Sequence, residues 1–269
     1  MSSREGLMTL RAAISPCPND TFIFGAWILG LVGDIPGVRT RFGWEDVQTL
    51  NEMAGQDQAD LIKVSAVTAL GLEHRYALLR AGGAFGLEHG PKLVVLRGAG
   101  SKPARVAVPG LQTTAYALLR AAVDHDFQTV PMPFDRIPGA VSRQEVDAGL
   151  LIHETALVHK ALGFEVLLDL GDWWREKTSG LPLPLGMIVI RKDLGREMKT
   201  EAEEIIRRSI SAAGEKRTVV DPLIRQLARE LDPLVIEQHI RAYVNRFSLD
   251  TGQEGGLALA RLRQVAGIG

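Results

Sequence analysis

The segment Gly98-Ala99-Gly100-Ser101-Lys102-Pro103 interrupts a regular succession of strand-like and helix-like runs. Before it, apolar runs at residues 60–64 (DLIKV) and 93–96 (LVVL) alternate with runs of helical spacing. After it, the alternation restarts at residues 105–108 (RVAV). A short stretch of small and polar residues between two such blocks is typical of a linker. We therefore expect the chain to pass from one α/β unit to another near this segment.

A second break at residues 179–185 (SGLPLPL) precedes the strand-like run 186–190. Two breaks around a middle block predict an inserted domain. Residues 1–98 and 186–269 would form one discontinuous α/β lobe with C-terminal helices and a largely parallel sheet, and residues 99–185 a second lobe. The two crossings would make a hinge, and the cleft between the lobes is a natural small-molecule site. One continuous α/β sheet remains the alternative.

Composition and charge exclude several classes of function. The protein has 269 residues, 31 Lys and Arg against 32 Asp and Glu, and a formal net charge of −1. This balance leaves no broad cationic field for nucleic acid or an anionic membrane, so we expect neither as a partner. The single cysteine, Cys17, excludes an internal disulfide framework and a cysteine-based zinc cluster. Because no secretory signal or membrane span is recognisable, we expect a cytoplasmic protein.

The most unusual stretch is Ser15-Pro16-Cys17-Pro18-Asn19-Asp20-Thr21-Phe22, which lies between a predicted strand and a predicted helix. Two prolines fix φ and remove two backbone donors. Asn19, Asp20 and Thr21 are all favoured helix caps. The stretch is therefore either a rigid capped turn or a ligand-binding loop at the carboxyl end of a strand, where α/β sheets place their ligands.

Two similar junctions follow along the chain. Ser65 ends the run DLIKV and opens a helix, and Thr113 and Thr114 open the helical run 114–122. Each offers a hydroxyl beside unpaired backbone N–H groups, an arrangement that favours an anion. Ser and Thr are also the commonest caps, so each junction taken alone favours the structural explanation. Helix starts from both lobes that converge on one cleft would suit a carboxylate ligand.

His153 is the histidine that we single out as a catalytic candidate. It ends the apolar strand 148–152 and precedes a helix start at Glu154-Thr155. Its ordinary pKa of about 6.5 suits proton transfer near neutrality; the alternative is a hydrogen-bonded structural histidine. The other histidines are weaker candidates, because they lie in polar or loop-like surroundings (His74, His89, His125, His239) or off the spacing of a metal motif (His159). H-E-x-x-H, P-loop and G-x-G-x-x-G motifs are absent.

Five segments together resemble the 1,4-dihydroxy-6-naphthoate synthases of the futalosine route to menaquinone. They are SPCPNDTF at 15–22, TTAY at 113–116, IHE at 152–154, GLPLPLG at 180–186 and YVNRFSLD at 243–250. They occur in order over nearly the whole chain, and the first is the most specific. The resemblance implies a fold similar to the type II periplasmic binding proteins, with two α/β lobes around a cleft, in a cytoplasmic enzyme.

The resemblance also implies the reaction and the residues that carry it. The enzyme would be a carbon–carbon lyase that cleaves cyclic dehypoxanthinyl futalosine, a small carboxylate, to 1,4-dihydroxy-6-naphthoate. No cofactor and no metal are expected, and a homodimer stays open. The family's catalytic histidine, a general base, falls on His153. Its substrate-binding residues fall on Ser15, Asn19, Asp20, Thr21, Ser65, Thr113 and Thr114.

Two other functions remain open on the same fold. One is that of the sister enzyme of the pathway, chorismate dehydratase, although SPCPNDTF and His153 favour the synthase. The other is a non-catalytic small-carboxylate solute-binding protein. Product formation separates both alternatives from the synthase, because a binding protein would be stabilised by its ligand without converting it.

Overall fold

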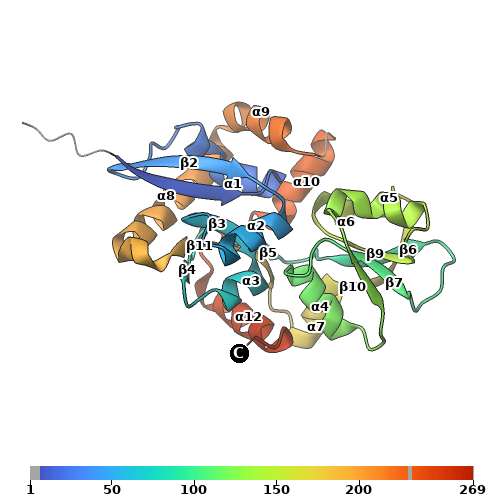
Figure 1. Cartoon of the computed structure of the whole chain (residues 1–269). Coiled ribbons are helices and arrows are strands. Elements are labelled where there is room, and N and C mark those ends of the chain that lie inside the picture. The colour runs from blue at the N-terminus through green and yellow to red at the C-terminus, as the bar shows by residue number, and fades with distance from the viewer. Residues whose placement is uncertain (1–6, 230–231, 269) are drawn as a thin grey trace, which may run out of the picture.

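The first lobe is built on a six-stranded mixed sheet in the computed structural model, which describes residues 7–229 and 232–268 (Figure 1). The order is β2-β1-β3-β11-β4, with β5 also paired to β11. The strands are β1 (Met8–Ile14), β2 (Val38–Trp44), β3 (Leu61–Ser65), β4 (Tyr76–Leu78), β5 (Ala84–Gly86) and β11 (Leu183–Arg191).

The prediction of a largely parallel sheet in this lobe is wrong. β1 runs parallel to β2 and β3, whereas β11 runs antiparallel to β3, β4 and β5. The physical reason is that β11 enters the sheet on the way back from the second lobe. Its direction follows from the position of the crossing and is not encoded in its apolar pattern.

Helices cover both faces of this sheet, which explains why its central strand β3 is buried throughout. Leu61 of β3 packs on one face with α1 (Pro18–Ile28) and α8 (Gly195–Glu215), while Ile62 packs on the other with α2 (Val47–Gly55) and α3 (Ala66–Gly71). Successive strand residues point to opposite faces, so a strand buried on both sides reads as a continuous apolar run. The remaining helices of the lobe are α9 (Arg217–Leu227), α10 (Pro233–Tyr243), α11 (Arg246–Leu249) and α12 (Gly252–Val265).

The second lobe holds a five-stranded sheet in the order β10-β6-β9-β7-β8. Its strands are β6 (Lys92–Leu96), β7 (Arg105–Val108), β8 (Gln128–Pro131), β9 (Ala148–Leu151) and β10 (Phe164–Asp169). Its helices are α4 (Thr114–Ala122), α5 (Ile137–Ser142), α6 (His153–Leu157) and α7 (Leu170–Thr178), with a short 3₁₀ turn at Phe134–Arg136.

The first crossing between the lobes lies earlier than the glycine-rich segment. β5 belongs to the first sheet and β6 to the second, so the chain crosses between Gly86 and Lys92 rather than near Gly98. The segment 98–103 is the connection between β6 and β7 within the second lobe. It resembles a linker because a surface loop and an interdomain linker favour the same small and polar residues. The return crossing lies between α7 and β11.

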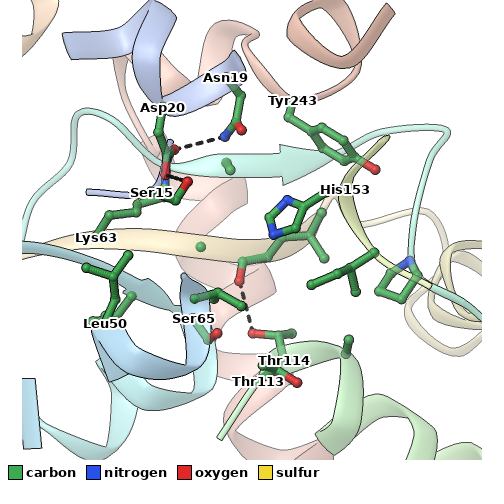
Figure 2. Close-up of a pocket in the computed structure, with 18 of the residues that line it drawn as sticks. Ser15, Asn19, Asp20, Leu50, Lys63, Ser65, Thr113, Thr114, His153 and Tyr243 are labelled. Carbon is green, nitrogen blue, oxygen red and sulfur yellow. Dashed lines mark hydrogen bonds and ion pairs between the residues drawn. The ribbon is translucent and has the colours of Figure 1, made fainter. Parts of the chain in front are cut away.

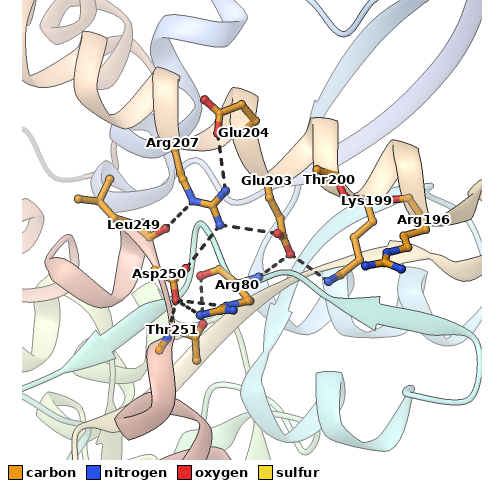
Figure 3. Close-up of polar contacts among 11 residues, drawn as sticks. Arg80, Arg196, Lys199, Thr200, Glu203, Glu204, Arg207, Leu249, Asp250 and Thr251 are labelled. Atoms are coloured by element: carbon orange, nitrogen blue, oxygen red, sulfur yellow. Dashed lines mark hydrogen bonds and ion pairs between the residues drawn. The ribbon is translucent and has the colours of Figure 1, made fainter.

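A polar cluster fastens the C-terminal helices to the first lobe (Figure 3). Glu203 of α8 accepts the backbone N–H of Arg80 at 3.0 Å and pairs with Lys199 at 3.1 Å. The Arg80 guanidinium pairs with Asp250, and the Arg80 carbonyl accepts the backbone N–H of Thr251 at 2.7 Å. The segment after β4 is therefore tied both to α8 and to the start of α12.

None of the helices in residues 7–229 and 232–268 has the length and apolar character that crossing a bilayer requires.

Candidate active site

A cavity lies between the two lobes. The first lobe contributes the loop after β1, the end of β3 and a face of α10, and the second lobe contributes the starts of α4 and α6 (Figures 1 and 2). Its polar lining is Ser15, Asn19, Asp20, Lys63, Ser65, Thr113, Thr114, His153, His239 and Tyr243, and its apolar lining includes Val47, Leu50, Ile152 and Leu185.

The cavity brings together all but one of the site residues predicted from the sequence. They come from four separate strand-to-helix junctions, two in each lobe. The exception is Thr21, which is fully buried in the first turn of α1 and does not line the cavity. Its hydroxyl donates to the carbonyl of Pro16 at 3.4 Å. Consecutive helix residues point in directions about 100° apart, so a neighbour of Asp20 need not share its environment.

His153 occupies the first position of α6 and projects into the cavity (Figure 2). Its φ of +52° is rare for a residue with a side chain. The ring packs between the edge of Phe134, with centroids 4.9 Å apart, and the face of His239, with centroids 5.8 Å apart. Within the described residues neither ring nitrogen makes a hydrogen bond, and the residue lines the cavity.

The surroundings of His153 keep its imidazole neutral at physiological pH. Burial lowers the pKa of His153 to about 4, and His239 adds to this effect, while the carboxylate of Glu154 opposes it. A neutral imidazole with free nitrogen atoms can accept a proton. The geometry and charge of this residue therefore fit a general base.

On the first-lobe side of the cavity, Asp20 is the centre of a compact polar group. Its carboxylate accepts from the Ser15 hydroxyl at 2.7 Å and from the Asn19 amide at 2.9 Å, and pairs with the Lys63 ammonium at 2.8 Å (Figure 2). Lys63 also donates to the carbonyl of Gly82 at 3.0 Å. A buried carboxylate with this many donors is held in one orientation.

On the opposite side, the start of α4 presents backbone donors to the cavity. Thr113 caps the helix by accepting the backbone N–H of Tyr116 at 3.2 Å, and its own hydroxyl donates to Gly110 at 2.8 Å. The N–H groups of Thr114 and Ala115 have no acceptor within the helix. Both residues line the cavity, so this end favours an anionic group.

Ser65 stands beside this helix start and is held by Asn51. The Ser65 N–H donates to the Asn51 side-chain oxygen at 2.8 Å, and the Asn51 amide donates to the Ser65 hydroxyl at 3.1 Å. The same amide donates to the carbonyl of Gln112 in the second lobe at 3.1 Å. Asn51 thus fixes the Ser65 hydroxyl in place next to the start of α4.

Three polar residues of the cavity were not predicted as site residues from the sequence. Lys63 lies inside β3, and the presence of a lysine within an apolar run is the sequence signal that could have identified it. His239 and Tyr243 lie one turn apart on α10, buried against each other with ring centroids 5.0 Å apart. The description of His239 as a residue in polar surroundings is wrong, because the polar residues next to it in sequence lie on the outer face of the helix. Burial raises the pKa of Tyr243, which keeps its hydroxyl protonated.

Among the described residues, no three His, Cys, Asp or Glu side chains are placed to hold a metal ion.

Comparison with known proteins identifies relatives along almost the full chain. Residues 10–267 match the profile of a family described as menaquinone biosynthesis. A relative from Thermus thermophilus, named 1,4-dihydroxy-6-naphtoate synthase, is 44% identical over 255 residues, which is 94% of this chain and 92% of that protein. A crystal structure of protein AF1704 from Archaeoglobus fulgidus superposes with a TM-score of 0.90 at 37% identity, covering 96% of this chain and 97% of that one.

More distant solved structures show the fold class. The periplasmic aliphatic sulphonate binding protein SsuA from Escherichia coli has a TM-score of 0.64 at 13% identity, with 97% of this chain and 86% of that chain covered. The chain therefore has the two-lobed fold of the periplasmic binding proteins, as its sequence predicted.

Proposed function

The chain belongs to the menaquinone-biosynthesis family, and we propose that it is a 1,4-dihydroxy-6-naphthoate synthase that works in the cytoplasm. The reaction is the cleavage of cyclic dehypoxanthinyl futalosine with loss of the sugar-derived fragment, which makes the protein a carbon–carbon lyase. The single observation that carries the proposal is a neutral imidazole, His153, between an anion-binding helix start and a compact polar group in one cavity.

The two ends of the cavity suit the two ends of this substrate. The carboxylate lies at the start of α4, where the N–H groups of Thr114 and Ala115 and the Ser65 hydroxyl supply donors. The fused ring lies against Leu50 and Ile152. The hydroxyl-rich remnant of the sugar then lies towards Asp20 and its partners, where donors and acceptors alternate.

His153 acts as the base in this arrangement. Its neutral ring accepts a proton from the sugar-derived portion, and the electron pair left behind promotes elimination and cleavage of the carbon–carbon bond. Cleavage is favourable because the departing ring becomes fully aromatic. The ammonium of Lys63 lies beside Asp20, on the side of the cavity assigned to the sugar remnant. There it stabilises the negative charge that develops on oxygen.

The test is turnover of the cyclic substrate, followed by the chromophore of the dihydroxynaphthoate product. We expect turnover by the wild-type protein and a loss of 10²–10⁴-fold in His153→Asn, the range typical of a general base. His74→Asn, a change at an exposed histidine, is the matched control and should keep full turnover. Conversion of chorismate instead, or ligand-induced stabilisation without any product, would overturn the proposal in favour of the sister enzyme or of a binding protein.

A further inference from the structure

A second imidazole, that of His239, lies directly against the ring of His153. The two rings are nearly parallel, with an angle of 13° between their planes and 5.8 Å between their centroids. His239 is 0% exposed, and both of its nitrogen atoms face protein groups. Nε2 lies 3.0 Å from the side-chain oxygen of Asn19, and Nδ1 lies 3.3 Å from Oε2 of Glu154. His239 therefore offers a bound molecule no free nitrogen, and its contact with the catalytic candidate is through the ring face.

The hydrogen-bond pattern fixes which way this ring is held. The Asn19 amide nitrogen donates to Asp20, so the Asn19 oxygen is the acceptor and Nε2 of His239 is the donor. On the other side, Nδ1 of His239 and Oε2 of Glu154 face each other 3.3 Å apart. Neither of these two buried atoms has a hydrogen-bond partner within the described residues. Each is therefore the only polar partner that the other has there.

This row of contacts crosses from one lobe to the other. Glu154 follows His153 on α6 of the second lobe, whereas His239 on α10 and Asn19 on α1 belong to the first. Glu154 is 5% exposed, and burial alone would raise the pKa of its carboxyl; the contact with His239 outweighs burial and lowers it. The contact thus holds an ionised group of α6 against the first lobe, one residue away from His153.

We propose that His239 is a positioning residue for His153. Asn19 and Glu154 hold the ring of His239, and the face of that ring holds the imidazole of His153 in the plane that proton removal requires. The left-handed φ of His153 gives the reason why such support is needed, because the backbone there is in a conformation that side-chain-bearing residues rarely adopt. The inference rests on the proposed function for its kinetic readout.

The kinetic test uses a matched pair at Glu154. Glu154→Ala removes the contact, and we expect kcat to fall at least tenfold while KM changes less than threefold. In Glu154→Gln the amide N–H can donate to Nδ1 while Nε2 still donates to Asn19, so this variant should recover most of the lost turnover. His239→Ala should lose as much turnover as Glu154→Ala. The double variant that combines these two alanine substitutions should lose no more turnover than His239→Ala alone, because both changes remove the same support. Equal defects in Glu154→Gln and Glu154→Ala, or full turnover in His239→Ala, would overturn the proposal.

A second measurement keeps the test independent of the substrate. Proton–carbon NMR of the His153 ring reports its order in the protein alone. We expect a rigid ring in the wild type and in Glu154→Gln, and a mobile ring in His239→Ala and Glu154→Ala, with thermal unfolding confirming that each variant is folded. If the wild type fails to convert the cyclic substrate but the ring behaves in this way, the proposed function fails and the positioning role stands. A rigid ring in all variants would reject that role.

Discussion

At the residue scale, the molecule concentrates its unusual chemistry at position 153. The side chain lies at a strand end that the apolar run 148–152 predicts, and this is why the sequence could identify it. Its left-handed φ and its lowered pKa could not be read from the sequence, because both depend on groups that lie far along the chain, such as Phe134 and His239. The position of His153 at a strand end was therefore predictable from the sequence, whereas its backbone conformation and its pKa were not.

The backbone of His153 leads to a prediction about stability. Asn adopts the left-handed region more readily than Ala, for which this region costs about 1 kcal/mol. We expect the free energy of unfolding of His153→Asn to exceed that of His153→Ala by about 0.5–1 kcal/mol, measured by urea denaturation. The same pair at His74, whose φ is not positive, is the control and should not show this preference for Asn. An equal or more stable His153→Ala would contradict the argument from strain.

The lowered pKa of His153 leads to a prediction about pH. The base works in its unprotonated form, and its pKa of about 4 in the folded protein keeps it unprotonated well below neutrality. We expect kcat/KM to stay level from neutral pH down to about pH 5 and to fall as the pH nears 4. Return of the enzyme to neutral pH should restore full turnover, which excludes unfolding as the cause. An acid limb near 6.5, the ordinary value for histidine, would show that the surroundings do not lower the pKa of His153.

The same shift links folding to pH. The unfolded chain binds the proton of His153 near pH 6.5, and the folded protein binds it near pH 4. The contribution of this residue to stability is therefore complete above pH 6.5 and is lost as the pH falls from 6.5 to 4. Unfolding measured across this window should show a smaller loss in His153→Asn than in the wild type.

At the element scale, periodic apolar patterns predicted the longer elements and missed the short ones. β7 and α4 have the predicted bounds, because each combines a strong pattern with a clear turn or cap. β4 and β5 have three residues each, too few for a period to be visible. β5 lies in a glycine-rich run that reads as a turn, and its pairing with β11 depends on residues about a hundred positions away.

The polar cluster on α8 gives a prediction at this scale. Glu203→Ala leaves the Arg80 N–H without its acceptor and should lower the free energy of unfolding by about 2 kcal/mol. Glu203→Gln keeps an acceptor oxygen and loses only the ion pairs with Lys199 and Arg207, so its cost should stay below about 1 kcal/mol. Glu204→Ala, at an exposed neighbour, should change stability by less than about 0.5 kcal/mol. Equal losses for the two Glu203 variants would assign the effect to the charge instead of the hydrogen bond.

At the scale of the whole molecule, the two lobes bring together groups that no local pattern connects. The loop SPCPNDTF and the helix starts at Ser65 and Thr113 could be predicted as ligand-binding because each has a recognisable junction in the sequence. His239 could not, because it lies within a helix whose pattern indicates only packing. Lys63 gave a single signal, a lysine within an apolar strand, which does not by itself indicate a ligand site. Their role depends on how the two lobes are arranged around the cavity.

The measurement that tests the account most directly is chemical rescue of His153→Gly. Glycine adopts a φ of +52° without strain and leaves space for an imidazole molecule in the cavity. If the ring at this position removes the proton, His153→Gly should lose at least about 10²-fold in turnover of the cyclic substrate, and added imidazole should restore it saturably, in proportion to the neutral form. Substrate binding without any rescue, or near-wild-type turnover in His153→Gly, would contradict the central claim.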